Sequence, residues 1–144
     1  NCYEPILASL NEKKFEINEL NKVHEEEGIG SIAFSPLAQG VLTNKYLNGV
    51  PEDSRAKKVS SVFLNEKDIT EEKIEKIKAL NEIAQGRNQS LAQMALTWVL
   101  REDRVTSVLI GASRKSQIID NAQIVNNLTF TAEELEKIAR IIEK

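Results

Sequence analysis

The sequence predicts an α/β fold in which parallel strands alternate with helices. Two short apolar runs, 31–34 and 105–110, have the length of buried strands, and helical periodicity fills most of the remaining chain. Strands that alternate with helices are typical of βαβ units, whose strands run parallel. Residues 1–3 are interpreted as the end of a third strand. Two or three parallel strands form a poor sheet by themselves, so the pattern predicts part of a larger α/β protein.

The first half of the chain is expected to hold a helix, a strand and a long loop. Apolar residues recur at helical spacing before Gly28, and glycine commonly follows a helix C-terminus. The strand 31–34 is stopped by Pro36. Residues 35–68 then lack periodicity and are rich in Gly, Pro, Ser, Asn and charge, which is typical of a functional loop or of disorder.

The second half is expected to be mostly helical. Thr70 is a good N-cap for a helix that Gly86 ends, and capping boxes at 90–93 and 131–134 start two further helices. Three adjacent apolar residues, 108–110, predict a strand that is buried on both faces, as in a parallel sheet. One more helix follows that strand, marked by Ile118, Ile119, Ala122 and Val125.

Composition excludes several classes of protein. The 19 basic and 22 acidic residues give a net charge of −3, and the pI near 5.4 argues against a nucleic-acid partner. No apolar run approaches the roughly 18 residues of a membrane span. The single cysteine excludes an internal disulfide and a Cys-rich metal site, which fits a reducing cytoplasm. Since the chain starts at Asn1 and its only methionine is Met94, we expect it to be processed, trimmed or part of something longer.

Both clear strands end in small polar residues, where ligands bind in α/β folds. The first strand is followed by 35–40 and the second by 111–114, which leads into a helix. Free N–H groups at a helix N-terminus attract phosphate, and Gly111 allows a close backbone approach. Asp120 and Asn121 follow about two helical turns later. Each segment alone could be only a turn or a cap, and neither a G-x-G-x-x-G nor a P-loop motif is present.

Taken together and in this order, the segments resemble the aldo-keto reductase family. Residues 34–46 resemble its segment after the seventh barrel strand, 91–100 its seventh helix, 105–113 with 120–121 its eighth strand and cofactor-phosphate loop, and 127–135 its terminal extra helix. The resemblance covers essentially all 144 residues. It is nearest to the subgroup of potassium-channel β-subunits and bacterial relatives, which carry Gly-Ala-Ser in that loop.

The resemblance implies the C-terminal portion of a TIM (β/α)₈ barrel, from the end of strand 6 to the terminal helix, with residues 1–144 as one partial domain. It implies an oxidoreductase that binds NADP(H) and reduces a small-molecule carbonyl. The family's catalytic Asp, Tyr, Lys and His come from earlier strands and match no position here, so no catalytic residue and no metal ligand is assigned and the isolated chain is expected to be inactive. The alternative is a non-catalytic half-barrel that binds nucleotide or forms a homo-oligomer through its open edges.

The resemblance also implies which residues contact the cofactor. Phe34 matches the aromatic that stacks on the nicotinamide ring. The positions around the pyrophosphate are Ser35, Pro36, Leu37, Ala38 and Gly40, with the basic residues Lys45 and Arg55 closing over the phosphates. The positions around the adenosine 2′-phosphate and adenine are Gly111, Ser113, Arg114, Gln117, Asp120 and Asn121.

Overall fold

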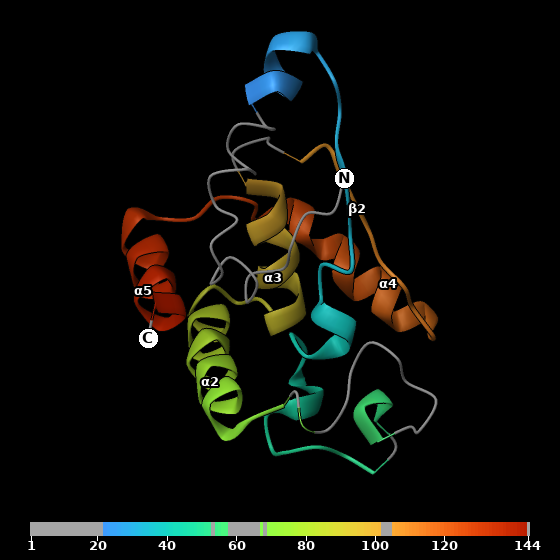
Figure 1. Cartoon of the computed structure of the whole chain (residues 1–144), viewed down its shortest axis with the longest axis vertical. Helices are drawn as coiled ribbons and strands as arrows, with labels where there is room; N and C mark the ends of the chain where they lie inside the picture. Colours follow the sequence, from blue (N-terminus) through green and yellow to red (C-terminus); the bar gives the residue numbers. More distant parts are fainter. Residues whose placement is uncertain (1–21, 53, 58–66, 68, 102–104, 144) are drawn as a thin grey trace.

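The computed structural model describes residues 22–52, 54–57, 67, 69–101 and 105–143. Residues 22–27 are helical. The elements that follow are β1 (Ile32–Phe34), η1 (Ala38–Gly40), η2 (Asn44–Tyr46), η3 (Arg55–Lys57), α2 (Glu71–Gly86), α3 (Leu91–Leu100), β2 (Ser107–Leu109), α4 (Lys115–Ala122), η6 (Gln123–Asn126) and α5 (Ala132–Glu143) (Figure 1). The strand end expected at residues 1–3 and the start of the first helix lie outside the described residues.

The two predicted strands pair in parallel, which confirms the predicted α/β class. Ala33 of β1 lies opposite Val108 of β2, and Phe34 lies opposite Leu109. Ala33 is buried against Val99 of α3, so this face of the sheet is covered. The expected burial of the second strand on both faces is wrong, because Leu109 of β2 is 60% exposed. Phe34, its partner on β1, is 49% exposed. The described helices cover only one face of this two-stranded sheet.

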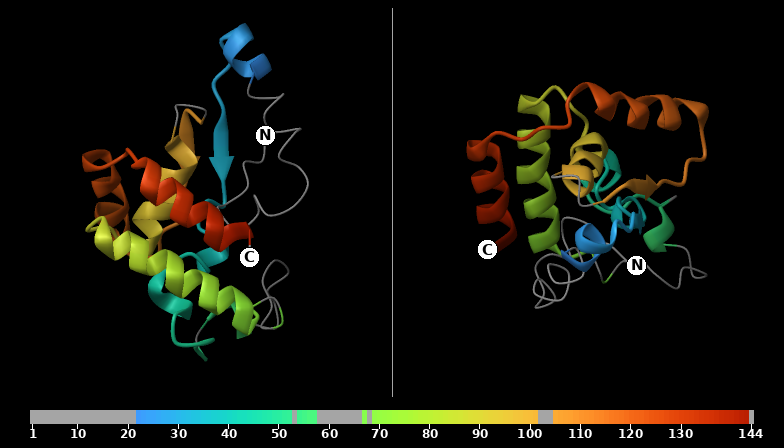
Figure 2. Two further views of the ribbon diagram at one scale, coloured as in Figure 1. Left: turned by 90° about the vertical axis from the view of Figure 1, so that its left-hand side faces the viewer. Right: turned by 90° about the horizontal axis from the view of Figure 1, so that it is seen from above.

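The helices lie in a row across the molecule, in the order α5, α2, α3 and α4 (Figures 1 and 2). Thr70 caps α2 as predicted, since its side chain accepts a hydrogen bond from the Lys73 N–H. Gly86 is the last residue of α2, but the left-handed residue that turns the chain is Asn88, with φ of 56°. Gly28 has φ of 66° and ends the first helix as expected.

Both predicted capping boxes are present. The Ser90 hydroxyl accepts from the Gln93 N–H at 3.2 Å, and the Gln93 side chain accepts from the Ser90 N–H at 2.8 Å. Thr131 and Glu134 make the same pair of bonds at 3.2 and 2.8 Å. Each box uses groups only three residues apart, which is why the sequence pattern predicts it.

We expect Thr131→Ala to lower the free energy of unfolding by about 1 kcal/mol, because it leaves an N–H of the first turn of α5 without its acceptor. The measurement is urea unfolding followed by circular dichroism. Thr129→Ala is the matched control, since Thr129 is exposed and its bond in the structure uses the backbone carbonyl. Equal unfolding midpoints for Thr131→Ala and the unaltered protein would contradict the capping role.

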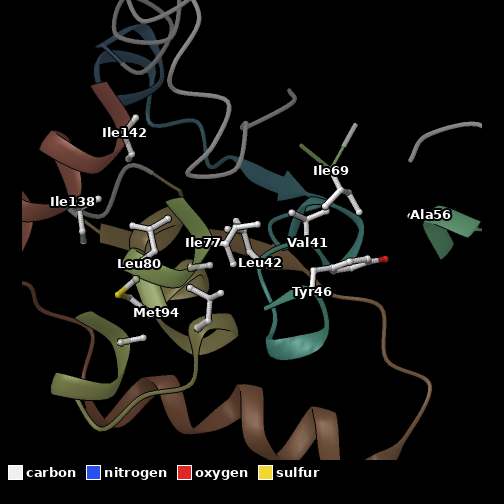
Figure 3. Close-up of a cluster of buried hydrophobic side chains, with 13 residues drawn as sticks. Val41, Leu42, Tyr46, Ala56, Ile69, Ile77, Leu80, Met94, Ile138 and Ile142 are labelled. Carbon is white, nitrogen blue, oxygen red and sulfur yellow. The ribbon is translucent and has the colours of Figure 1, made fainter. Parts of the chain in front are cut away.

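The main core lies between α2, α3, α5 and the segment that follows β1 (Figure 3). Ile77 and Leu80 of α2 and Met94 of α3 are fully buried in it. Leu42 and Tyr46 of the expected loop also belong to this core. The described part of 35–68 is therefore a set of 3₁₀ turns packed onto the helices, and residues 53, 58–66 and 68 lie outside the described residues.

A buried arginine fastens α5 to the end of α2. The Arg87 side chain is 2% exposed and pairs with Glu134 of α5, Nη1 to Oε2, at 2.5 Å. Its Nη2 donates to the Thr129 carbonyl at 2.8 Å, and its guanidinium lies 4.0 Å from the centre of the Phe130 ring. These contacts fix the connection between η6 and α5, and no pattern in the sequence predicts them.

Three large apolar side chains are exposed on α4 and η6, among polar neighbours. Ile118, Ile119 and Val125 are all more than half exposed. Within the described ranges, no helix combines the length and the apolar character needed to cross a membrane.

Candidate functional site

The two strand ends open into one groove of about 760 Å³, because β1 and β2 are parallel neighbours and their carboxyl ends meet at one edge. The segment after β1 forms one wall, and the segment after β2 together with α4 forms the other. Ten residues that the sequence analysis assigned to the cofactor line this groove: Ser35, Pro36, Leu37, Gly40, Lys45, Gly111, Ser113, Gln117, Asp120 and Asn121.

Four assigned residues are not among those lining the groove. Phe34 lies on the open face of the sheet, one residue before Ser35. Ala38 lies in η1, and Arg114 is the N-cap of α4. Arg55 belongs to η3, but its side chain is outside the part of the chain that the structure describes.

Other groove residues were not predicted. They are Gln39, Thr43, Asn44, Tyr46, Ser90, Ala92, Leu109, Ile110 and Ala112. Several of them adjoin predicted residues and could have been found by extending each segment. Ser90 and Ala92 begin a different helix, α3, and nothing in the local pattern places that helix end beside the groove.

The backbone after β1 has an unusual conformation. Ser35, Ala38 and Gln39 have φ of 54°, 48° and 59°, in the left-handed region that non-glycine residues seldom adopt. Such residues are strained and concentrate at ligand sites. Leu37, with φ of −99°, precedes the left-handed Ala38, so the chain reverses its direction sharply just after β1.

Hydrogen bonds within the chain hold this strained segment in place. The Ala38 N–H donates to the Ser35 carbonyl at 3.0 Å, and the Gly40 N–H donates to the Leu37 carbonyl at 2.9 Å. The Thr43 hydroxyl donates to the Gly40 carbonyl at 2.7 Å. The wall is therefore preformed, which limits the ordering that binding requires.

We expect Gly40→Ala to lower the free energy of unfolding by about 1 kcal/mol or more, because Gly40 has φ of 96°, where a Cβ is strained. A Cβ at this position would meet nothing within 4 Å, so the loss comes from the backbone alone. Gly111→Ala is the control, since Gly111 also has open space but no positive φ. Urea unfolding of both variants measures the difference in stability. Equal unfolding midpoints for Gly40→Ala and Gly111→Ala would show that a Cβ at residue 40 causes no backbone strain.

The loop after β2 aims three donors at one point. The Ser113 N–H, the Ser113 hydroxyl and the Arg114 N–H donate to Oε1 of Gln117 at 2.9, 3.2 and 3.1 Å. The oxygen they share is an uncharged carboxamide oxygen of α4 itself. An anionic oxygen would suit the same donors better, since charge-assisted bonds are stronger and the helix dipole favours negative charge at this end. The loop therefore fits a phosphate group.

Asp120 and Asn121 form the far wall of the groove. Asn121 is buried, whereas Asp120 is exposed and bonded to α3. The Gln93 side-chain N–H₂ group donates to the Asp120 carbonyl at 2.7 Å and to its carboxylate at 3.2 Å. This contact joins two helices whose bonded residues are 27 positions apart.

Among the residues that the structure describes, neither histidine nor cysteine lines the groove, and no group of three or more potential metal ligands occurs. The lining combines apolar side chains such as Leu37 and Ile110 with hydroxyls, side-chain amides and the Lys45 ammonium. These polar groups can bind an anionic ligand.

Fold and groove together define an α/β protein with a groove at the carboxyl ends of two adjacent parallel strands. The profile of the aldo/keto reductase family matches residues 2–143. The chain belongs to the aldo/keto reductase family, and the predicted resemblance is confirmed.

Individual relatives support this assignment. The chain is 54% identical over 116 residues to an L-glyceraldehyde 3-phosphate reductase of Escherichia coli K12, covering 79% of this chain and 34% of that protein. It is 36% identical over 123 residues to a probable voltage-gated potassium channel subunit beta of Arabidopsis thaliana, covering 84% and 38%. The chain thus spans little more than a third of the curated relatives it matches.

A solved structure shows the same fold. The glycerol dehydrogenase of Gluconobacter oxydans superposes with a TM-score of 0.67 at 18% identity, covering 96% of this chain and 40% of that one. The chain therefore has the fold of part of a TIM barrel, as expected from its sequence. The aldo/keto reductases to which it belongs are oxidoreductases. The coverage also accounts for the open face of the sheet, since a complete barrel of this type has eight strands.

Proposed function

We propose that the groove binds NADP(H) and that the chain is the cofactor-binding part of a carbonyl reductase. One observation carries the proposal: the segments that follow two neighbouring parallel strands line the same groove. After β1 the lining includes residues of 35–40 together with Lys45. After β2 it includes Ser113 and Gln117, and the donors of Ser113 and Arg114 converge there on Oε1 of Gln117. An extended dinucleotide carries phosphate groups that these two segments suit. When bound, NADPH supplies the hydride that reduces a carbonyl.

The proposal assigns a role to each wall. Segment 35–40, with Lys45 and Arg55, holds the pyrophosphate, and Phe34 stacks on the nicotinamide. Ser113, Arg114 and Gln117 hold the 2′-phosphate. Asp120 and Asn121 contact the adenine.

The substrate proposed is a small aldehyde or ketone. The similarity to an enzyme named L-glyceraldehyde 3-phosphate reductase favours an aldehyde. Reduction needs a proton donor beside the carbonyl oxygen. We place that donor, with the rest of the catalytic Asp, Tyr, Lys and His, in the portion of the relatives that this chain does not span, so the isolated chain is expected to be inactive. We place the protein in the cytoplasm, because its single cysteine fits a reducing compartment.

The test is a fluorescence titration of the protein with NADPH and with NADH, followed by an assay of NADPH oxidation with aldehydes by a protein that also contains the missing barrel strands. Saturable binding, tighter for NADPH, is the expected result. Absence of binding at millimolar NADPH would contradict the cofactor assignment. If the complete barrel bound NADPH but reduced no aldehyde, the assignment as a carbonyl reductase would be wrong.

A second candidate function is self-association without catalysis. The observation that favours it is a set of exposed apolar side chains: Leu109 on β2, Ile118 and Ile119 on α4, and Val125 on η6. Light scattering tests it. A folded and strictly monomeric species of 16.2 kDa would exclude self-association through this surface.

A further inference from the structure

We infer that Gln93 is a positioning residue for the adenine side of the groove, an inference that rests on the proposed function. Gln93 is 8% exposed and does not line the groove. Both ends of its side chain are used: Oε1 accepts from the Ser90 N–H at 2.8 Å, and Nε2 donates to Asp120. One buried amide therefore ties the start of α3 to the last turn of α4.

The hydrogen bonds from Gln93 to Asp120 fix the position of the far wall of the groove. Nε2 of Gln93 reaches the backbone carbonyl of Asp120 at 2.7 Å and its carboxylate at 3.2 Å, so main chain and side chain are both fixed. The Ser90 hydroxyl lies 3.5 Å from the other carboxylate oxygen. Asn121, the next residue, is buried and lines the groove. The position of Asp120 and Asn121 against the first wall is therefore set through Gln93.

A capping role alone would not need this contact. A capping box requires the Gln93 side chain to accept from the Ser90 N–H, which a glutamate does equally well. The N–H₂ group adds a donor that glutamate lacks, and that donor is the one directed at Asp120. Glutamate at this position would face the Asp120 carboxylate and carbonyl with oxygen atoms only, which is repulsive.

The chain offers a matched control in Gln89, which is also buried, at 9% exposed. Its side-chain amide donates to the Asn127 carbonyl at 2.9 Å and accepts from Arg87 at 2.9 Å. It does not line the groove. Gln89→Leu and Gln93→Leu both remove a buried amide that bridges two segments, but only the second bridge leads to the groove.

The experiment measures the NADPH dissociation constant and the amide hydrogen exchange of residues 120–121 in the protein. We expect Gln93→Leu to weaken NADPH binding about tenfold, as the loss of one well-made hydrogen bond would, and to speed exchange at 120–121. Gln89→Leu should change neither by more than about twofold, even where it lowers the melting temperature as much. Binding within twofold of the unaltered protein for Gln93→Leu, or an equal loss for Gln89→Leu, would overturn the inference.

A second pair of variants separates positioning from general destabilisation. Gln93→Glu should weaken NADPH binding at least as much as Gln93→Leu. Because Asp120 is itself assigned to the adenine contact, the coupling between the two substitutions is what is measured. Gln93→Glu and Asp120→Asn together should cost less binding free energy than the sum of their separate costs, because the asparagine N–H₂ group can donate to the new carboxylate. A double-mutant cycle without this coupling would contradict the inference. Failure of the unaltered protein to bind NADPH would contradict the proposed function instead, and unchanged exchange at 120–121 in Gln93→Leu would then still refute the positioning role.

Discussion

Arg87→Met is expected to lower the free energy of unfolding by about 3 kcal/mol, because it removes the buried partner of an ion pair whose carboxylate is itself mostly buried. The methionine preserves the apolar stem of Arg87 over the Phe130 ring. It leaves the Glu134 carboxylate, the Thr129 carbonyl and the Gln89 side-chain oxygen without the donor they share. Urea unfolding by circular dichroism measures the change.

The control for this variant is the exposed pair of Glu133 and Lys137 on the same helix. The hydrogen bond to Lys137, followed by its positive charge, lowers the pKa of Glu133. A lowered carboxyl pKa contributes stability above the ordinary value of 4.5 that is lost as the pH falls, but full exposure makes the contribution small. Glu133→Gln should therefore leave the unfolding midpoint unchanged at pH 7. Equal midpoints for Arg87→Met and Glu133→Gln would show that the buried pair does not hold α5.

Ser113→Asp is expected to weaken NADPH binding about 100-fold while NADH binding changes by less than about threefold. The new carboxylate would lie beside the donors assigned to the 2′-phosphate, and facing like charges cost several kcal/mol. NADH lacks that phosphate, so it does not meet this repulsion. Parallel fluorescence titrations with the two nucleotides give the ratio.

Ser116→Asp is the matched control for this substitution. Ser116 is an exposed serine of α4 that does not line the groove. We expect both nucleotides to bind this variant within about threefold of the unaltered protein. Equal weakening of NADPH and NADH by Ser113→Asp would place the 2′-phosphate elsewhere.

Sequence reasoning succeeded where the determining contacts are local. The capping boxes that begin α3 and α5 use residues three apart, and both form as predicted. The groove also follows from the chain, because two parallel neighbouring strands necessarily bring the residues after Phe34 and Leu109 to one edge.

The features that the sequence did not predict depend on contacts between residues far apart in the chain. Arg87 stands in a polar turn, and its partner Glu134 lies 47 positions away, so no periodicity marks it as buried. Gln93 is recognisable as a capping residue, but its bond to Asp120 depends on how α3 and α4 pack. Leu109 has the pattern of a doubly buried strand and yet is exposed, because the described residues cover one face of the sheet only. Leu42 and Tyr46 lie in a segment without regular spacing, so their burial depends on the tertiary fold.

A titration of the ¹⁵N-labelled protein with NADPH, followed through the backbone amide signals, tests directly whether the groove binds the cofactor. We expect saturable shifts at 35–40 and at 111–121, the two walls of one groove, with the Ser113 and Arg114 signals shifting less for NADH than for NADPH. Shifts confined to one wall, shifts elsewhere on the chain, or identical responses to the two nucleotides would contradict this expectation.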